Sequence, residues 1–385
     1  CHYKGGFDTV SIYLQNNPDS HFFASKGLIL GGSHSPSPLN RNAHCGDLSA
    51  VLLQNLNPLV NLIRVPDKKI ILMDEWESKI KAIVESTWKT DVNSLSGVPS
   101  WMLVLIKAVL QKTGSEYLTD VWPNMEVFFH GGISFEPYRD QYKALIPSDR
   151  MHYMETYNAS EGFFGLQDNP EEHSLLLMID YSVFYEFIPI NEVGEEHPTV
   201  LPLEAVEVGK NYAMVITTSG GLWRYQIGDT VRFTSLYPHK FVISGRTKNF
   251  INAFGEELMV DNADKAISRV CRQTGAKVKE YTAAPLFMLD KAKGRHQWMI
   301  EFEKMPPSLD DFASLLDKTL QQLNSDYEAK RYKEISLQPL EIRVAREGTF
   351  YEWLRRKGKL GGQHKIPRLS NDRTFIEELG KICDL

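Results

Sequence analysis

The stretch Tyr153-Met154-Glu155-Thr156-Tyr157-Asn158-Ala159-Ser160-Glu161-Gly162-Phe163-Phe164-Gly165 decides how the fold of the chain is interpreted. An apolar, strand-like piece leads into a turn of small residues that holds a single acid, Glu161, and the chain then returns to aromatic residues. In α/β sheets ligands collect at the carboxyl ends of strands, so an acid just past a strand end is placed for ligand binding. A solvated turn acid beside two core aromatic residues is the alternative that the stretch alone leaves open.

Composition limits the size and the partners of the protein. A chain of 385 residues, 42% of them hydrophobic, can bury a large core. At roughly 150–200 residues per domain this length predicts two domains. The net charge of −6 gives no reason to expect a nucleic acid or an anionic membrane as partner. No apolar run reaches the roughly 18 residues that a membrane-spanning helix needs, and we recognise no signal peptide.

The four cysteines are widely separated and favour a cytoplasmic location. None belongs to a Cys-x-x-Cys pair, and none has the histidine spacing of a zinc site. Reduced thiols of this kind are typical of cytoplasmic proteins. The chain begins at Cys1 rather than at a methionine, so we expect it to start partway through a longer protein.

The first half of the chain alternates strand-like and helix-like segments. The predicted strands are Gly27–Leu30 and Glu126–Phe129, and the predicted helices are Asp47–Asn55, one capped by Asp74, and Trp101–Leu110 capped by Ser100. The first strand ends at Gly31-Gly32-Ser33, which lacks the Walker ending and favours a plain turn. The second strand runs into His130-Gly131-Gly132, where a flat ring or a phosphate can approach the backbone closely. A structural turn is equally consistent with these two glycines.

From residue 175 to 244 the pattern changes to short strands, which predicts a small barrel or an antiparallel sheet. The predicted strands are Leu175–Asp180, Val183–Ile190, Tyr212–Thr218, Leu222–Gln226, Thr230–Thr234 and Phe241–Ser244. Asp229 follows Gly228 at a strand junction, where it can accept hydrogen bonds from a ribose diol or form an Asx turn.

Beyond a linker at Gly245–Asn249 the sequence predicts a compact α+β domain. Its predicted helices are Ala263–Gln273, Leu309–Leu323 and Phe350–Arg356, and its predicted strands are Lys277–Leu289, Gln297–Phe302 and Leu340–Val344. Near the end, Gly358 to Pro367 form a glycine-rich loop in which Lys365 precedes a rigid Ile-Pro step. Because glycines make the chain flexible before Lys365 and a proline makes it rigid after it, we favour a functional role for this lysine over a merely solvated side chain.

Taken together, these segments resemble one family, the auxin-responsive acyl acid–amido synthetases. The family belongs to the acyl-adenylate-forming superfamily, which includes acyl-CoA synthetases and luciferases. The resemblance covers nearly the whole chain, with motifs matching in order and spacing. These motifs are Tyr157-Asn158-Ala159-Ser160-Glu161-Gly162-Phe163-Phe164-Gly165, Leu222-Trp223-Arg224-Tyr225-Gln226-Ile227-Gly228-Asp229, Pro339-Leu340-Glu341-Ile342-Arg343-Val344, Gly348-Thr349-Phe350 and Gln363-His364-Lys365-Ile366-Pro367-Arg368.

The resemblance implies an α/β fold with a β-barrel-like subdomain. A large N-terminal lobe would cover residues 1–247, with its β-rich part at about 175–244, and a small mobile α+β domain would cover 248–385. The family's Ser/Thr-Gly-rich phosphate loop lies upstream of all these motifs, so we expect this chain to lack it. Ala159 stands where plant members commonly have a serine, which would remove one hydroxyl near the acyl carboxylate.

The resemblance also implies a reaction in two steps. A carboxylic acid attacks the α-phosphate of ATP to give an acyl-adenylate and pyrophosphate, and an amine, usually an amino acid, then attacks the acyl carbon and expels AMP. Lys365 would neutralise the charge that builds between the carboxylate and the α-phosphate. Glu161 would hold Mg²⁺ on the phosphates.

The remaining site residues follow from the same resemblance. Tyr157 would stack near the adenine, Asp229 would bind the ribose, and Arg246 and Lys248 match the hinge between the domains. The other residues expected at the ATP or AMP site are Gly131, Gly132, Asn158, Ala159, Ser160 and Phe241. For the acyl substrate we expect Val98, Trp101 and Leu105.

Two other functions remain open. An acyl-CoA synthetase would use the same adenylate with a thiol in place of the amine, and a nucleotide- or acid-binding module would bind without turnover. A serine hydrolase is disfavoured, because the sequence has no Gly-x-Ser-x-Gly motif. The identities of the acid and the amine, and the oligomeric state, do not follow from the sequence.

Overall fold

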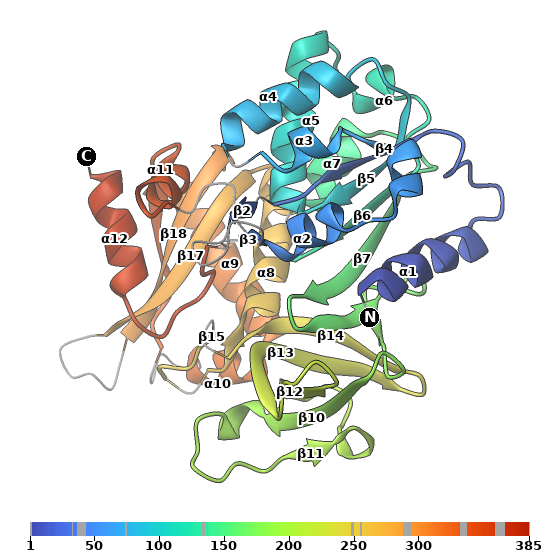
Figure 1. The fold of residues 1–385 in the computed structure, drawn as a ribbon. Coiled ribbons are helices and arrows are strands. Elements are labelled where there is room, and N and C mark those ends of the chain that lie inside the picture. The colour runs from blue at the N-terminus through green and yellow to red at the C-terminus, as the bar shows by residue number, and fades with distance from the viewer. Residues whose placement is uncertain are drawn as a thin grey trace. The chain divides into compact units, whose positions relative to one another are not determined.

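The structure is a computed structural model in which the chain forms two compact units (Figure 1). It describes residues 2–32, 34–36, 44–73, 75–132, 135–136, 138–247, 250–254, 256–287, 294–331, 337–358 and 366–384. Unit 1 comprises Cys1–Val183, Tyr237–Phe241 and Gly361–His364. Unit 2 comprises Phe184–Leu236, Val242–Leu360 and Lys365–Leu385. None of the described helices is both long and apolar enough to cross a membrane.

Unit 1 is built on a sheet whose central strands are parallel. In spatial order the strands run β4, β1, β5, β6, β7, β8, β9, and the first residues of β14 pair with β9. The pairs from β4 to β7 are parallel, and β7–β8 and β8–β9 are antiparallel. The bounds are β1 Lys26–Leu30, β4 Arg64–Val65, β5 Val92–Gly97, β6 Val127–Gly131, β7 His152–Ala159, β8 Gly162–Leu166, β9 Leu175–Leu177 and β14 His239–Arg246.

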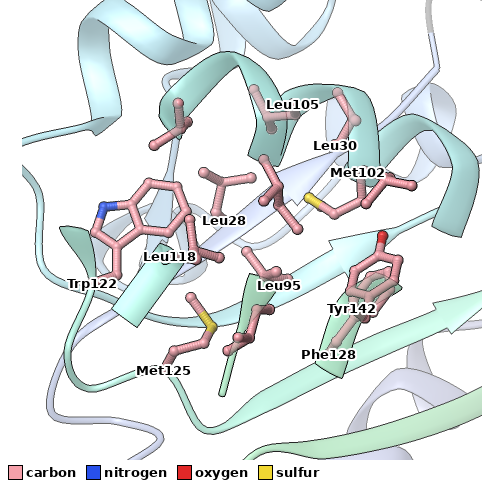
Figure 2. Packing of buried hydrophobic residues seen from close by; sticks show 14 of the residues in the cluster. Leu28, Leu30, Leu95, Met102, Leu105, Leu118, Trp122, Met125, Phe128 and Tyr142 are labelled. Carbon is pink, nitrogen blue, oxygen red and sulfur yellow. The ribbon is translucent and has the colours of Figure 1, made fainter. Parts of the chain in front are cut away.

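Helices cover this sheet because its strands carry apolar side chains on both faces. On one face, Leu28 of β1 and Leu95 of β5 pack with Met102 and Leu105 of α5 in a large core (Figure 2). On the other face, Tyr13 of α1 packs against residues of β6 and β7. The helices of this unit are α1 His2–Asn16, α2 Leu48–Gln54, η1 Pro58–Leu62, α3 Lys68–Ile71, α4 Trp76–Thr87, α5 Pro99–Thr113, α6 Leu118–Val121 and α7 Arg139–Leu145, and a small hairpin pairs β2 His34–Pro36 with β3 His44–Gly46.

Unit 2 contains two further groups of strands. The first runs in the order β11, β10, β12, β13, with the remainder of β14 beside β13. Within it β10 pairs antiparallel with β11, and β12 pairs antiparallel with β13. The bounds are β10 Val183–Pro189, η2 Ile190–Glu192, β11 Leu201–Pro202, η3 Leu203–Ala205, β12 Asn211–Thr218 and β13 Tyr225–Leu236.

The second group is a sheet in the order β17, β18, β19, with helices packed against it. Its strands are β17 Lys277–Phe287, β18 Gly294–Lys304 and β19 Glu341–Ala345, preceded by a small hairpin of β15 Phe250–Ile251 and β16 Leu258–Met259. The helices are α8 Val260–Thr274, α9 Leu309–Leu323, α10 Ser325–Arg331, α11 Thr349–Arg356 and α12 Thr374–Cys383. Ile267 of α8 and Leu316 of α9 share one core with Trp298 of β18.

The predicted elements are present, with shifts at their ends. The helix Leu309–Leu323 has the predicted bounds, and Gly114 ends α5 in the left-handed conformation at φ 72°. The prediction that Ser100 caps α5 is wrong, because Pro99 already occupies the first helical position, where its missing N–H costs nothing. The two strands predicted on either side of Gly228 form one strand, β13. Asp74 lies outside the described residues, and Glu75 caps α4.

Candidate functional site

The carboxyl ends of three parallel strands meet at one edge of the unit 1 sheet. Gly97, the last residue of β5, is in register with His130 of β6. Gly131, the last residue of β6, is in register with Thr156 of β7. Ligands in parallel α/β sheets bind at this edge, because the loops leaving the strands diverge there. Most of the site residues predicted for the first lobe therefore lie in one region of unit 1.

Gly131 and Gly132 lie at this edge with little room for side chains. A Cβ on Gly131 would come within 2.3 Å of the carbonyl oxygen of Thr156. Gly132 has a φ of +84°, which L-residues with side chains rarely adopt. A Cβ on Gly132 would lie 3.6 Å from Val98, so the ends of β5 and β6 are close neighbours. Both positions therefore favour glycine, Gly131 because of its close approach to β7 and Gly132 because of its positive φ.

Gly131→Ala is expected to lower the free energy of unfolding by about 1–3 kcal/mol, because the added methyl overlaps a carbonyl oxygen of β7 that cannot rotate away. Gly6→Ala is the matched control. Gly6 lies in α1 with no atom within 4 Å of an added Cβ. That change should stabilise the protein by roughly 0.5–1 kcal/mol. Urea denaturation measures both variants, and equal effects of the two changes would contradict the steric argument.

The stretch from Tyr157 to Gly165 forms a tight hairpin. Ala159 is in register with Gly162, so Ser160 and Glu161 form a two-residue turn, and the side chain of Glu161 is half-buried. The register shifts just after Tyr157, which marks a β-bulge in β8 at Phe164, the residue that has no register partner in β7. Bulges are frequent next to active sites, where they redirect side chains.

The residues around this turn differ in accessibility. Tyr157 is buried, and its ring contacts Phe164 at 5.1 Å and Phe241 at 6.1 Å between centroids. Phe241 of β14 is itself fully buried. Asn158 is exposed, and its Oδ1 lies 2.7 Å from Nδ1 of His2. Ser160 is exposed and Ala159 half-buried. The turn therefore presents polar groups above a layer of buried aromatic rings.

The three residues predicted to bind the acyl group lie on or before α5. Val98 directly follows β5 and is half-buried. Trp101 is also half-buried, and its ring lies 5.3 Å from the ring of Trp76 in the first turn of α4. Leu105 lies one turn further along and is 1% exposed, within the core of unit 1. Val98 and Trp101 are thus the more accessible pair of the three.

Asp229 and Arg246 form an ion pair in unit 2. The Nε of Arg246 donates to Oδ1 of Asp229 at 2.8 Å, and the backbone N–H of Thr247 donates to the carbonyl oxygen of Gly228. Three residues of β13, including Asp229, stand opposite one residue of β12, so Asp229 belongs to a bulge. Its side chain is 10% exposed, whereas that of Arg246 is 53% exposed. The motif that contains Glu161 and the motif that contains Asp229 therefore each include a β-bulge.

Two predicted residues, Lys248 and Lys365, lie outside the described residues. The segment that follows Lys365 is hydrogen-bonded to β17. The backbone N–H of Ala283 donates to the carbonyl oxygen of Arg368, and the N–H of Ser370 donates back to the carbonyl oxygen of Ala283. Arg368 also pairs with Glu280 at 2.8 Å. Residues directly after the lysine thus have a fixed place on the small sheet.

Sequence reasoning overlooked two buried polar residues near the edge of unit 1. His130 is the residue before Gly131 in β6, and its ring stacks on the ring of Phe135 at 4.2 Å between centroids. Burial lowers the pKa of His130 to about 3, so its imidazole is neutral at ordinary pH. Lys79 of α4 is 1% exposed. A lysine within the apolar stripe formed by Trp76, Ile80 and Ile83 is the signal that could have drawn attention to it.

The residues at this edge suit the binding of a flat group and of a hard cation. Backbone at Gly131 and Gly132 can approach a ring, and the Glu161 carboxylate is a hard oxygen ligand of the kind that Mg²⁺ prefers. Among the residues that the structure describes, no group of three or more His, Cys, Asp or Glu side chains could hold a metal ion.

Comparison with known proteins identifies the class. The N-terminal domain of the GH3 family matches residues 2–151, its central domain matches 176–246, and its C-terminal domain matches 261–374. The chain belongs to the GH3 family of acyl acid–amido synthetases, as its motifs predicted.

Several curated relatives have named activities. The chain is 30% identical over 318 residues to the indole-3-acetic acid-amido synthetase GH3.4 of Arabidopsis thaliana, a match that covers 74% of this chain and 51% of that protein. It is 27% identical over 347 residues to the 4-substituted benzoates-glutamate ligase GH3.12 of the same plant, covering 80% and 59%. The chain spans about half the length of the curated relatives it matches.

Solved structures share the fold. The GH3.15 acyl acid amido synthetase superposes with a TM-score of 0.74 at 18% identity, covering 94% of this chain and 73% of the other. A 2-hydroxyisobutyryl-CoA ligase superposes with a TM-score of 0.58 at 13% identity, covering 94% and 68%. These likenesses confirm the predicted mixed α/β class, with a large N-terminal sheet and a smaller C-terminal one.

Proposed function

We propose that the protein activates a small carboxylic acid with ATP and transfers the acyl group to an amine, most simply an amino acid. The observation that carries this proposal is family membership over three successive domains. The convergence of Gly131, Gly132 and the Glu161 turn at the carboxyl edge of one parallel sheet supports it. A carboxylate is a poor acyl donor until one of its oxygens becomes part of a phosphate leaving group, which is why the first step consumes ATP.

The predicted residues would divide the work of this reaction, with Arg246 and Lys248 at the hinge between the domains. Gly131, Gly132 and Tyr157 would receive the adenine, and Asn158, Ala159, Ser160 and Phe241 would complete that part of the site. Asp229 would bind the ribose hydroxyls, held in orientation by its 2.8 Å contact with Arg246. Lys365 would place a positive charge between the attacking carboxylate and the α-phosphate. Val98, Trp101 and Leu105 would contact the acyl group.

Glu161 would hold Mg²⁺ together with oxygens of the phosphates. Mg²⁺ in nucleotide sites is commonly bound by one or two carboxylates plus substrate phosphates, and a single half-buried turn carboxylate fits that pattern. The ion supplies charge neutralisation at the phosphates, and the residues of the chain orient the reacting groups.

Glu161→Gln is expected to raise the Mg²⁺ concentration needed for half-maximal pyrophosphate release about tenfold or more, because the amide keeps the shape of the side chain but loses its charge. Glu196→Gln, on an exposed loop of unit 2, is the control and should change nothing. A Mg²⁺ titration of both variants measures the effect. An unchanged titration for Glu161→Gln would exclude this carboxylate as a ligand.

The proposal extends to the arrangement of the chain and its surroundings. We propose that the chain divides into a large lobe over 1–247 and a small mobile domain over 248–385. We also propose that the β-rich part of the large lobe closes like a barrel. The cytoplasmic location predicted from the cysteines belongs to the same proposal. The named acids of the relatives, indole-3-acetic acid and 4-substituted benzoates, are the first acids to test.

Pyrophosphate release by the full-length protein tests the function. Release should require both ATP and a carboxylic acid, and AMP release should then require an amino acid. Release that is indifferent to a panel of acids would overturn the proposal. Tight AMP binding by calorimetry without turnover would favour a binding module instead.

An acyl-CoA synthetase is the second candidate, because the fold is shared with a CoA ligase. Both candidates form the same adenylate, so the acceptor distinguishes them. Amino acids, hydroxylamine and CoA are compared as acceptors in AMP release. Preference for CoA would replace the amide-forming proposal.

A further inference from the structure

The order of the parallel strands in unit 1 reverses at β1. The chain passes from β1 to its neighbour β4, then back across β1 to β5, and on to β6 and β7 in the same direction. Because crossover connections are right-handed, the connection from β1 to β4 and the connections from β4 onwards run over opposite faces of the sheet. The loops leaving β1 and β5 therefore diverge. Such a reversal is where open α/β sheets bind ligands.

Residues on both sides of this reversal are close in the structure. Leu30 at the end of β1 is in register with Gly97 at the end of β5. Val98 follows Gly97, and Trp101 lies in the next turn of chain. Gly31 and Gly32 follow Leu30. The loop after β1 thus begins beside the residues proposed to contact the acyl group.

Lys79 fixes the start of that loop. Its Nζ donates to the carbonyl oxygens of Gly31 and Gly32 at 2.8 and 2.9 Å, although 48 and 47 residues separate them in sequence. The N–H of Gly32 donates to Oγ of Ser49 in α2 at 2.9 Å. The peptide between the two glycines is therefore held at its carbonyl by α4 and at its N–H by α2.

The burial of Lys79 is costly, and packing does not require it. Removing an ammonium group from water costs several kcal/mol unless its donors are satisfied. An apolar side chain would fill the same position in the stripe of α4 at no such cost. The hydrogen bonds to the two carbonyl oxygens of the loop are among the contacts that an apolar residue could not make. Lys79 therefore orients these two carbonyl groups, which an apolar side chain could not do.

We propose that Lys79 is a positioning residue for the carboxylic acid substrate, which it serves by fixing the Gly31–Gly32 peptide beside Val98 and Trp101. The inference rests on the proposed function. It assigns the acid to the β1–β5 side of the edge, while the nucleotide is proposed at Gly131 and Gly132 of the β6–β7 side. Loosening the loop should therefore raise KM for the acid more than KM for ATP.

Lys79→Met tests this in the full-length protein, because methionine keeps the length of the side chain and loses the donors. We expect KM for the acid to rise about tenfold or more, with KM for ATP within about twofold of wild type. Hydrogen exchange at Gly32 should accelerate locally. Lys81→Met, on the exposed side of α4, is the control and should change neither quantity. Ser49→Ala loosens the other end of the same peptide and should raise KM for the acid in the same direction.

Several results would overturn the inference. An equal rise in both KM values, a change confined to kcat, or unaltered exchange at Gly32 would each exclude a selective positioning role. If Lys79→Met fails to fold, the variants Ser49→Ala and Lys79→Arg replace it in the test. Wild-type KM values for the acid and for ATP in both of these variants would overturn the proposal. Failure of the proposed function is recognised separately, because wild-type protein would then release no pyrophosphate in response to any acid.

Discussion

Lys365→Ala should lower acid-dependent pyrophosphate release by about 10²–10³-fold, the size of effect seen when one positioned charge is removed from a developing anion. In the proposed first step two negatively charged groups approach each other, and a cation between them lowers the barrier. The segment after the lysine has a fixed place on the small sheet. Ile366 is buried, and Arg368 is held on β17 by a backbone hydrogen bond from Ala283 and by its ion pair with Glu280.

The two half-reactions separate this role from a general loss of structure. Transfer from a supplied acyl-adenylate to an amino acid involves no attack on phosphate, so Lys365→Ala should slow it far less than adenylation. Lys357→Ala is the matched control, since Lys357 pairs with Glu378 at 3.0 Å in the same part of the chain. It should leave both half-reactions within about twofold of wild type. Equal loss in both half-reactions of the Lys365 variant would contradict the electrostatic role.

Asp317→Ala should destabilise the protein by about 3–5 kcal/mol, because it removes the carboxylate that pairs with a buried guanidinium. Asp317 of α9 accepts hydrogen bonds from Nε and Nη2 of Arg331 at 2.8–3.0 Å and from the hydroxyl of Tyr327 at 2.7 Å. The side chains of Asp317 and Arg331 are only 8% and 9% exposed. Urea denaturation, followed by a probe of the small sheet, measures the change.

Two comparisons identify the cause of that loss. Lys318→Ala, on the exposed side of the same helix, should change the free energy of unfolding by less than about 0.5 kcal/mol. The double variant Asp317→Leu, Arg331→Met removes both charges and should recover part of the lost stability. A double variant no more stable than Asp317→Ala would show that lost packing, rather than an unpaired charge, dominates.

Local patterns predicted most of the elements because the relevant signals are short-range. α9 shows the amphipathic spacing of a helix and begins after Ser308, whose side chain accepts from the N–H of Asp311. The strand end before Ser160 was also predicted, whereas β6 continues to Gly131, two residues past the predicted end at Phe129. The break predicted at Gly228 was wrong, because a glycine at φ +84° also fits a bulge inside a continuous strand.

Features that depend on contacts between distant parts of the chain could not be predicted from the sequence. The pairing of Asp229 with Arg246 requires β13 and β14 to lie side by side, and a sequence gives no register between them. Lys79 was assigned no role from the sequence. Its burial and its two carbonyl partners depend on where α4 packs against the end of β1.

The sequence by itself determined the family of this protein and the side chains available for chemistry, because motif order and residue type are properties of the chain. The tertiary structure alone decided which of those residues share the edge of the unit 1 sheet. It also decided that Lys79 holds the loop after β1. Parallel strands pair only after long connections fold back, so the neighbours of a strand end are set by packing across the domain rather than by adjacent residues.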